Sequence, residues 1–311
     1  MTTALYRSPR FAEHDEPSHV ENQRRVQAID AALQRDGLLD THAQPAFEAA
    51  TFDQLARVHD PHYIEALERA AHQGGGWIDG DTYMGPQSFE VAALASGAAI
   101  GAVDAALSGA AKQGFVLARP PGHHARPSIG MGFCLFDTIA VGAAHALASG
   151  IERVAIVDWD VHHGNGTQEI FWTSSNVFFA SIHQWPLYPG SGAASETGVD
   201  AGAGYTLNVP LAAGEGNECY LRILDEQILP KLRAFQPELV MVSAGYDCHR
   251  DDPLGSMRVD EDGFAAMTGR LLDLAQAHAD ERIVLVLEGG YDPPALARSV
   301  VRTIQTLDGA V

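Results

Sequence analysis

The sequence predicts an α/β protein with three layers, α/β/α, built around a mostly parallel central sheet. Two observations predict this fold class. Short continuous apolar runs alternate with longer segments of helical spacing, which is the pattern of a parallel sheet covered by helices on both faces. The 311-residue chain also contains no long polar linker, so we expect residues 1–311 to form a single domain.

The expected strands are the continuous apolar runs, because a strand that is buried on both faces carries apolar residues at successive positions. In chain order these runs are FVLAR (115–119), RVAIVD (153–158), VFFASI (177–182), LVMVSA (239–244) and RIVLVLE (282–288).

Helical spacing predicts helices in the segments 20–35, 62–72, 137–149, 217–234, 261–279 and 293–308. Asp60 stands before a proline, in the position of a helix start, and the prolines of DPPALARS suit the first turn of the last helix. The small-residue tract 91–111 is long, but it is mostly alanine and glycine and is interrupted by Asp104. We expect a close-packed internal helix there rather than a membrane span.

The composition limits the classes of function. A formal net charge of −20 disfavours nucleic-acid binding, since contact with phosphates needs a basic face. The acidity attracts cationic substrates weakly or serves solubility alone. The chain opens without an apolar run, and its three cysteines show no CxxC spacing, which fits a reducing compartment. We therefore expect a cytoplasmic protein that binds neither nucleic acid nor membrane, and the sequence leaves a homo-oligomer open.

Each expected strand is followed by a loop that is punctuated by glycine or proline and rich in histidine, aspartate and tyrosine. In order, the loops contain PPGHHA, WDVHHGNG, IHQWPLYPGSG, GYDCHRDDPLG and GGYDPP. Ligands of open α/β sheets bind at the carboxyl ends of the strands. We therefore expect the five loops to converge on one site.

A metal site is predicted after the second of these strands. Asp158, Asp160 and His162 are spaced i, i+2, i+4, so on an extended backbone they lie on one face. Asp247, from a neighbouring strand end, completes a three-ligand set with an open position for water. Two aspartates and a histidine suit Zn²⁺, Fe²⁺ or Co²⁺, and the sequence does not choose among them. The alternative, polar strand-end residues that cap helices, is weakened by the convergence of five loops.

Two further motifs predict proton chemistry. His123 and His124 follow PPG, a rigid turn that can aim both rings at the sheet's end, where a neutral imidazole can take a proton from water and return it to a leaving amine. Tyr291, in EGGY, can donate its phenolic proton to a developing oxyanion. The alternative for Tyr291 is an aromatic ring that packs on the last helix.

Taken in order, RPPGHHA, DWDVHHGNG, SAGYD and EGGY resemble the motifs of the zinc-dependent histone deacetylase family, which has the arginase/deacetylase fold. The chain looks closest to the class II and bacterial amidohydrolase branch, which includes acetylpolyamine amidohydrolases. The resemblance implies an amidohydrolase that removes an acetyl or other acyl group from an N-acylated amine such as acyl-lysine. It also implies one Zn²⁺ per chain.

The resemblance also assigns roles to residues of this chain. The implied metal ligands are Asp160, His162 and Asp247; the implied catalytic residues are His124 as base and acid, His123 as its electrostatic support and Tyr291 as the group that polarises the carbonyl. Asp158 is implied to pair with His123 and Asn165 with His124, where the neutral amide leaves His124 less inclined to take a proton.

Substrate contacts are implied in the same way. Gly132 and Phe133 match one wall of a tunnel, Tyr188 the opposite wall and Asp81 an acidic group on its rim. Leu254 stands where polyamine-specific relatives can place a glutamate. A structural monovalent cation, K⁺, is implied at Asp158, Asp160, His162, Ser181 and Ile182, and we expect His163, His183 and His249 to be structural or to face the rim.

Three alternatives remain. An acetylpolyamine amidohydrolase is favoured by the charge of −20 and disfavoured by Leu254. An arginase-like binuclear enzyme needs a second set of bridging carboxylates, and SAGYD offers one aspartate. A non-catalytic acyl-amine binding protein has no need of Tyr291 and His124.

Overall fold

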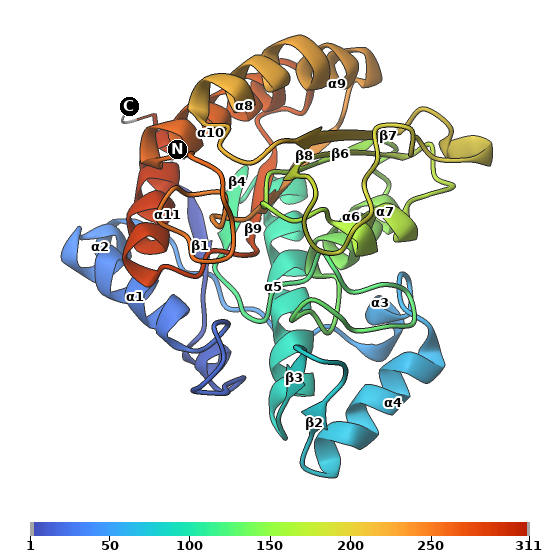
Figure 1. Ribbon diagram of the computed structural model, residues 1–311, viewed down its shortest axis with the longest axis vertical. Coiled ribbons are helices and arrows are strands. Elements are labelled where there is room, and N and C mark those ends of the chain that lie inside the picture. The colour runs from blue at the N-terminus through green and yellow to red at the C-terminus, as the bar shows by residue number, and fades with distance from the viewer. Residues whose placement is uncertain (1–2, 310–311) are drawn as a thin grey trace.

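Residues 3–309, which the computed structural model describes, are built around a seven-stranded sheet (Figure 1). In spatial order its strands are β1 (Ala4–Tyr6), β4 (Gln113–Val116), β9 (Ile283–Leu287), β8 (Leu239–Ala244), β5 (Val154–Asp158), β6 (Val177–Gln184) and β7 (Thr206–Leu211). All neighbouring pairs are parallel. A separate antiparallel hairpin joins β2 (Gly76–Trp77) to β3 (Tyr83–Met84). The predicted fold class is confirmed.

Helices cover both faces of this sheet. One face carries α1 (Arg24–Arg35), α8 (Asn217–Ile223), α9 (Leu229–Phe235), α10 (Glu261–His278) and α11 (Pro293–Leu307). The other carries α4 (Pro61–His72), α5 (Ser88–Ser108), α6 (Thr138–Ala148) and α7 (Asn165–Ile170). Shorter pieces are α2 (Leu38–Thr41), α3 (Phe52–Leu55), the 3₁₀ turns Pro9–Ala12 and Asp200–Gly202, and a π-helical turn, Leu224–Ile228, between α8 and α9.

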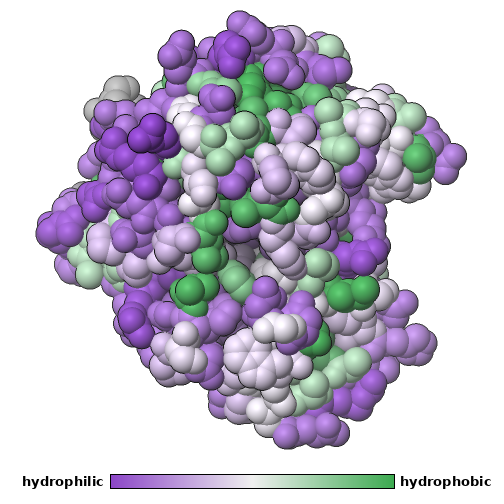
Figure 2. All heavy atoms as spheres, viewed as in Figure 1, coloured by the Kyte–Doolittle hydropathy of each residue, from purple (hydrophilic) through white to green (hydrophobic). Residues whose placement is uncertain are grey.

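The strands are continuous apolar runs because each of their faces is buried against one of these layers. In β5, Ala155 and Val157 belong to the cluster with α1, α8, α10 and α11, whereas Val154 and Ile156 belong to the cluster with α4, α5 and α6. Each fully buried valine or isoleucine contributes about 1.5–3 kcal/mol. Hydrophilic residues cover most of the outline of the molecule, and hydrophobic ones gather toward the middle of the face in Figure 2, around a hollow.

Helix α5 is long and apolar enough to cross a membrane by length and composition, yet 72% of its most apolar 18-residue window is buried inside the protein. It packs on α6, β4 and β9. Gly97 lets the segment before α3 approach, because a Cβ at this position would lie 1.8 Å from the Glu48 carbonyl oxygen. The prediction of an internal helix is confirmed, with bounds three residues earlier than 91–111.

The helix starts predicted from proline are also confirmed. The Asp60 side chain accepts a hydrogen bond from the His62 amide at 2.7 Å, and that of Asp292 accepts one from the Ala295 amide at 2.8 Å. Each aspartate is followed by a proline at the first helical position, where no amide hydrogen is needed.

Several predicted bounds are wrong. The strand predicted over 115–119 is Gln113–Val116, since its pairing with β9 runs from Gln113 to Val116. The helix predicted over 20–35 begins at Arg24, and the segment 217–234 is interrupted by the π-helical turn. Strands β1 and β7 were not predicted. The first has three residues, and the second is an edge strand that contains Pro210 and the polar Asn208.

Candidate active site

One cavity of about 210 Å³ lies where the strand-end loops meet. The loops after β4, β5, β6, β8 and β9 all contribute to it, and the β2–β3 hairpin closes one side. Its lining consists of Asp81, His124, Gly132, Phe133, His162, Tyr188, Leu254 and Tyr291. The structure therefore brings together residues that are up to 210 positions apart in the chain, and the expected convergence of the five loops is confirmed.

A buried cluster of Asp160, His162 and Asp247 adjoins this cavity through His162, which lines it. One ligand atom from each residue lies within 4.8 Å of the other two. The Nδ1 atom of His162 is 3.1 Å from Oδ1 of Asp160 and 3.1 Å from Oδ2 of Asp247. Strand β5 ends at Asp158, so the extended backbone assumed for residues 158–162 does not continue. Asp160 and His162 still share a side, because Trp159 and Val161 are buried in the core.

Backbone amides hold the two carboxylates of the cluster. Asp160 accepts hydrogen bonds from the amides of His162 and Gly289, at 2.9 and 2.8 Å, and Asp247 accepts one from Val161 at 2.8 Å. Gly289 has to be glycine, because a Cβ there would lie 2.1 Å from Oδ2 of Asp247. The EGGY segment thus approaches the cluster more closely than any other residue type would allow.

The electrostatics of the cluster favour a bound cation. Burial and the nearby Asp160 carboxylate raise the pKa of Asp247 to about 7. Burial alone would lower the pKa of His162, but its hydrogen bonds with Asp160 and Asp247 outweigh burial and raise that pKa to about 10. The two carboxylates therefore stabilise positive charge at the position between them, next to Nδ1 of His162. Two carboxylate oxygens and one imidazole nitrogen at these separations fit a divalent ion of the zinc type.

The histidine pair stands beside this cluster with its ring centroids 4.0 Å apart. His123 Nδ1 lies 2.9 Å from the Asp158 carboxylate, and His124 Nδ1 lies 2.7 Å from the Asn165 amide oxygen. Burial would lower the pKa of His123, but Asp158 and Asp160 raise it well above its usual value. Burial, together with the charges on His123 and His162, lowers the pKa of His124 well below its usual value. His124 is thus the ring that is free to accept a proton at neutral pH.

Tyr291 lines the cavity with its phenol ring. Burial raises its pKa well above 10, which keeps the hydroxyl protonated and able to donate. Its amide donates to Oδ2 of Asp252 at 2.6 Å, and the Arg25 guanidinium lies 4.9 Å from its ring centroid. These contacts fix both the main chain and the ring of Tyr291.

The expected tunnel residues also face the cavity. Gly132 and Phe133 have φ values of +57° and +70°, and a Cβ on Gly132 would lie 2.5 Å from the His124 ring. Phe133 meets the Tyr291 ring edge to face at 5.7 Å, and Tyr188 meets the His124 ring in the same way at 5.1 Å. The Leu254 amide donates to Asp252 at 2.9 Å.

Asp81 lies at the rim, on the loop between β2 and β3. Burial and the neighbouring Asp79 carboxylate raise the pKa of Asp81. Asp79 holds this loop by accepting the amides of Asp81 and Thr82, at 3.0 and 2.6 Å. Thr82 in turn accepts the Phe133 amide at 3.2 Å, which ties the rim to the tunnel wall.

Of the residues expected at a monovalent-cation site, Asp158, Ser181 and Ile182 lie on the adjacent strands β5 and β6, whereas Asp160 and His162 follow the end of β5. Asp158 of β5 and Ser181 of β6 are register partners, and Ile182 follows Ser181. Ser181 Oγ lies 2.9 Å from His183 Nδ1. His163 is buried, with its nitrogens 2.8 Å from Ser191 Oγ and 3.0 Å from Gln168 Oε1. His163, His183 and His249 are all buried and lie outside the cavity lining.

Sequence reasoning missed a buried ion network behind the cavity. Glu21 accepts two hydrogen bonds from Arg119, both at 2.6 Å, and one from Arg25 at 2.9 Å. Arg25 also donates to the Gly290 carbonyl at 2.7 Å. The network joins the RPPG turn to the EGGY turn. Two features of the sequence could have indicated this network: the i, i+4 spacing of Glu21 and Arg25, and the arginine that precedes PPGHH.

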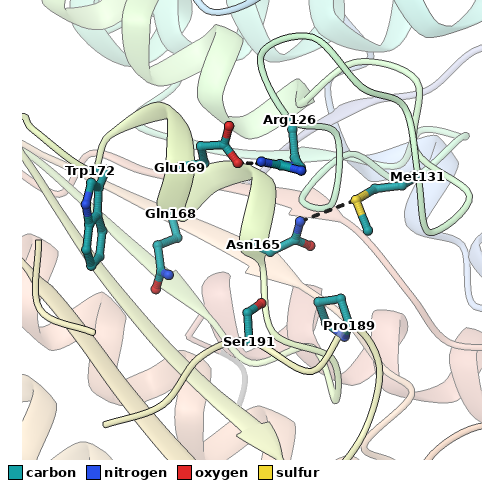
Figure 3. A pocket seen from close by; sticks show the side chains of 8 residues that line it. All are labelled: Arg126, Met131, Asn165, Gln168, Glu169, Trp172, Pro189 and Ser191. Carbon is teal, nitrogen blue, oxygen red and sulfur yellow. Dashed lines mark hydrogen bonds and ion pairs between the residues drawn. The ribbon is translucent and has the colours of Figure 1, made fainter. Parts of the chain in front are cut away.

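Figure 3 shows a second, more open pocket of about 390 Å³, which is lined by neighbouring parts of the same loops. Met131 and Pro189 line it, and their chain neighbours Gly132 and Tyr188 line the tunnel. Asn165 borders this pocket with an amide that points at Met131 Sδ, 3.5 Å away, while its oxygen faces His124. Arg126 pairs with Glu169 across the rim.

The strand-end loops, the buried cluster of carboxylate and imidazole groups and the adjoining histidine pair define an α/β protein with a candidate metal centre beside a cavity. The model of the histone deacetylase domain matches residues 19–307, and the chain belongs to this family. The resemblance drawn from the four sequence motifs is thereby confirmed. Membership in this family supports a hydrolase of the deacetylase class.

Individual relatives agree with this placement. The chain is 40% identical over 293 residues to a histone deacetylase-like amidohydrolase of Pseudomonas aeruginosa, covering 94% of this chain and 77% of the relative. A probable deacetylase of Archaeoglobus fulgidus is also 40% identical, over 94% of this chain and 82% of its own length. The human polyamine deacetylase HDAC10 is 37% identical, over 95% of this chain and 46% of its own length. The crystal structure of the HDA15 HD domain superposes with a TM-score of 0.95 at 37% identity, covering 99% of this chain and 88% of that one.

Proposed function

We propose that this protein is a zinc-dependent amidohydrolase that removes an acetyl or other acyl group from an N-acylated amine such as acyl-lysine. The observation that carries the proposal is that His124, His162 and Tyr291 line one cavity. A base, a metal ligand and a hydrogen-bond donor thus surround a single volume. We further propose a cytoplasmic location, because the three cysteines are free thiols, which fits a reducing compartment.

Asp160, His162 and Asp247 would hold one Zn²⁺. When bound, the ion supplies a Lewis acid that polarises the acyl carbonyl and makes water a stronger acid. The backbone amides of His162, Gly289 and Val161 keep the two carboxylates in place for this task. A monovalent ion such as K⁺ between β5 and β6, near Asp158 and Ser181, would add positive charge behind the cluster.

His124 moves the proton in this mechanism. Its low pKa leaves the ring neutral, so it accepts a proton from the attacking water. Water adds to the acyl carbon, the C–N bond breaks, and the same proton passes from His124 to the leaving amine. The second proton of the water leaves the carboxylic acid at neutral pH and is taken up by the amine, so the products are a carboxylate and a protonated amine. His123, held by Asp158, stays protonated beside it and opposes a lasting second charge on His124.

Tyr291 stabilises the negative charge that develops on the carbonyl oxygen. Its hydroxyl remains protonated because burial raises its pKa, and it faces the same cavity as His124. Such a pre-placed donor acts most strongly in a site that excludes water. A non-catalytic acyl-amine binding protein would gain nothing from this pairing of donor and base.

The cavity suits a narrow aliphatic stem. Phe133 and Tyr188 offer aromatic walls for the methylenes of an acylated lysine, and Asp81 offers an acceptor at the rim. An N-acetylpolyamine is the second candidate, favoured by the net charge of −20 and by the 37% identity to the human polyamine deacetylase. Leu254, which lines the cavity without a charge, disfavours it.

A turnover panel tests the proposal. The purified protein, loaded with zinc, is assayed with acetyl-lysine peptides, longer acyl-lysines, N-acetylputrescine and N-acetylspermidine. We expect the acyl-lysine peptides to be preferred by more than about tenfold in kcat/KM, which is about 1.4 kcal/mol of transition-state discrimination. A preference for the acetylpolyamines would replace the first candidate by the second. Binding of these compounds or of a hydroxamate without any turnover would favour the binding protein.

A further inference from the structure

Glu288 is a buried carboxylate that none of the roles described so far uses. It is the first residue after β9 and is 0% exposed. Its Oε2 atom accepts two hydrogen bonds from the histidine loop, one from the Gly122 amide at 2.6 Å and one from the His123 amide at 3.1 Å. Its Oε1 atom has no hydrogen-bond partner within residues 3–309. The side chain is thus committed to the loop that carries His123 and His124.

The main chain of Glu288 is fixed from three directions. Its amide donates to the Ala244 carbonyl of β8 at 3.1 Å, and its carbonyl accepts a hydrogen bond from Arg25. The next amide, that of Gly289, donates to Asp160 at 2.8 Å. The residue that grips the histidine loop is therefore attached rigidly to the metal-ligand cluster, and Tyr291 follows three residues later on the same segment.

The other contacts of the histidine loop do different work. Asp158 and Asn165 orient the rings of His123 and His124 but do not hold the main chain. The His123 carbonyl accepts the Gly166 amide at 2.9 Å, which fixes the opposite side of the same peptide segment. The Gly122 and His123 amides instead donate to one carboxylate oxygen of Glu288, which ties this side of the loop to the end of β9.

We propose that Glu288 is a positioning residue for proton transfer. By accepting hydrogen bonds from the two loop amides, its Oε2 atom holds His124 at its working distance from the metal-ligand cluster and from Tyr291. This inference rests on the proposed hydrolase function. The role requires a hydrogen-bond acceptor at the right distance and does not require negative charge. Glutamine has an acceptor oxygen on a side chain of the same length. Aspartate keeps the negative charge, but its side chain is shorter by one C–C bond, so its oxygens lie about 1.5 Å further from the two amides.

The experiment compares Glu288→Gln with Glu288→Asp in the zinc-loaded protein, using the best substrate of the turnover panel. We expect Glu288→Gln to keep kcat within about threefold of the wild type. Glu288→Asp should lose roughly 10-fold to 100-fold in kcat, since a displacement of about 1 Å suffices for such losses. KM, zinc content and hydroxamate affinity should stay within about threefold in both variants, because neither the tunnel nor the ligand cluster is changed.

Other results overturn the assignment. If aspartate is tolerated and glutamine is not, the charge of Glu288 acts rather than its acceptor geometry. If both variants keep kcat, or if both lose it in proportion to zinc or folded protein, Glu288 has no positioning role. A wild type without turnover on any substrate would instead remove the proposed function itself, and this inference with it.

Asp260→Ala is the matched control. Asp260 also accepts a backbone amide, that of Gly263 at 3.2 Å, but it does so at the start of α10, outside the cavity lining. Its loss should lower the melting temperature and leave kcat and KM within about twofold. A purely structural role for Glu288 would give this same pattern, which separates it from positioning.

Discussion

The two histidine pairs of this protein share a dipeptide and differ in how many of their rings reach the candidate site. His123 and His124 both stand at the candidate site, one against the Asp158 carboxylate and the other against the Asn165 amide. In the second pair only His162 reaches the site, between two carboxylates, while His163 is buried against the neutral groups of Ser191 and Gln168.

The difference teaches that the partner, and not the dipeptide, sets the chemistry of each ring. Carboxylate partners raise the pKa of His123 and of His162, whereas burial without such a partner lowers the pKa of His124 and that of His163. Each pair thus contains one ring of each kind. The two pairs differ in which ring takes the functional role. In the first pair it is the neutral ring, His124, as the candidate base, and in the second it is the carboxylate-bonded ring, His162, as the candidate metal ligand.

The largest effect on zinc content and turnover should follow from removing a carboxylate that contacts His162 of the second pair. Asp247→Ala removes one of three ligands and leaves His162 with a single carboxylate. We expect zinc content to fall from about one ion per chain to traces and turnover to fall to background, because an open three-ligand site cannot spare a ligand. Elemental analysis of the purified protein and the deacylation assay measure the two quantities. Full zinc retention in Asp247→Ala would rule out its assignment as a ligand.

The next effect concerns the donor that faces the first pair. Tyr291→Phe removes the hydroxyl and keeps the ring that packs against Phe133 and Arg25. We expect kcat to fall by roughly 10²-fold or more, as for the loss of an oxyanion donor, with zinc content and KM unchanged. Steady-state kinetics with metal analysis decide the point. Unchanged turnover would return Tyr291 to a packing role.

A single substitution gives His124 of the first pair a carboxylate partner like those of His162 in the second. Asn165→Asp places a carboxylate about where the amide oxygen lies, 2.7 Å from His124 Nδ1. An adjacent negative charge favours the protonated ring, so the pKa of His124 rises and a higher pH is needed to keep it neutral. We expect the acid limb of the kcat/KM profile to move to higher pH by about one unit or more. An acid limb that does not move would show that His124 is not the base.

The fold was predictable where local pattern carries it. Strands β5, β6 and β8 are uninterrupted apolar runs because both of their faces are buried, and the sequence located them within two residues. Strand β7 was not predicted because an edge strand tolerates Pro210 and polar Asn208, which break the apolar signal.

The site divides along the same line. Residues in strand-end loops, such as His124 and Asp160, were predictable because strand direction alone delivers them to one edge of the sheet. The contact of Arg119 with Glu21 joins residues 98 positions apart, and it depends on side-chain packing that no local spacing encodes. Glu288 was missed for a related reason. The sequence does not indicate whether a glutamate after a strand is exposed to solvent or buried under a loop.

The smallest effect on turnover is expected at His163, the ring that faces away from the site. His163→Phe keeps a ring of similar size and removes the hydrogen bonds to Ser191 and Gln168. We expect kcat and zinc content within about threefold of the wild type and a loss of about 1–3 kcal/mol in the free energy of unfolding at pH 7.

The pH dependence of stability supplies a sharper test of the same residue. Burial lowers the pKa of His163 to about 4 in the folded protein, below the value of about 6.5 in the unfolded chain. Between these values the unfolded state binds the extra proton, so His163 makes the wild type less stable as pH falls through this window. The variant has no such group, so its disadvantage relative to the wild type should shrink from pH 7 to pH 5. Urea unfolding at the two pH values measures this difference, and a disadvantage that grows at pH 5 would mean that His163 is protonated in the folded protein.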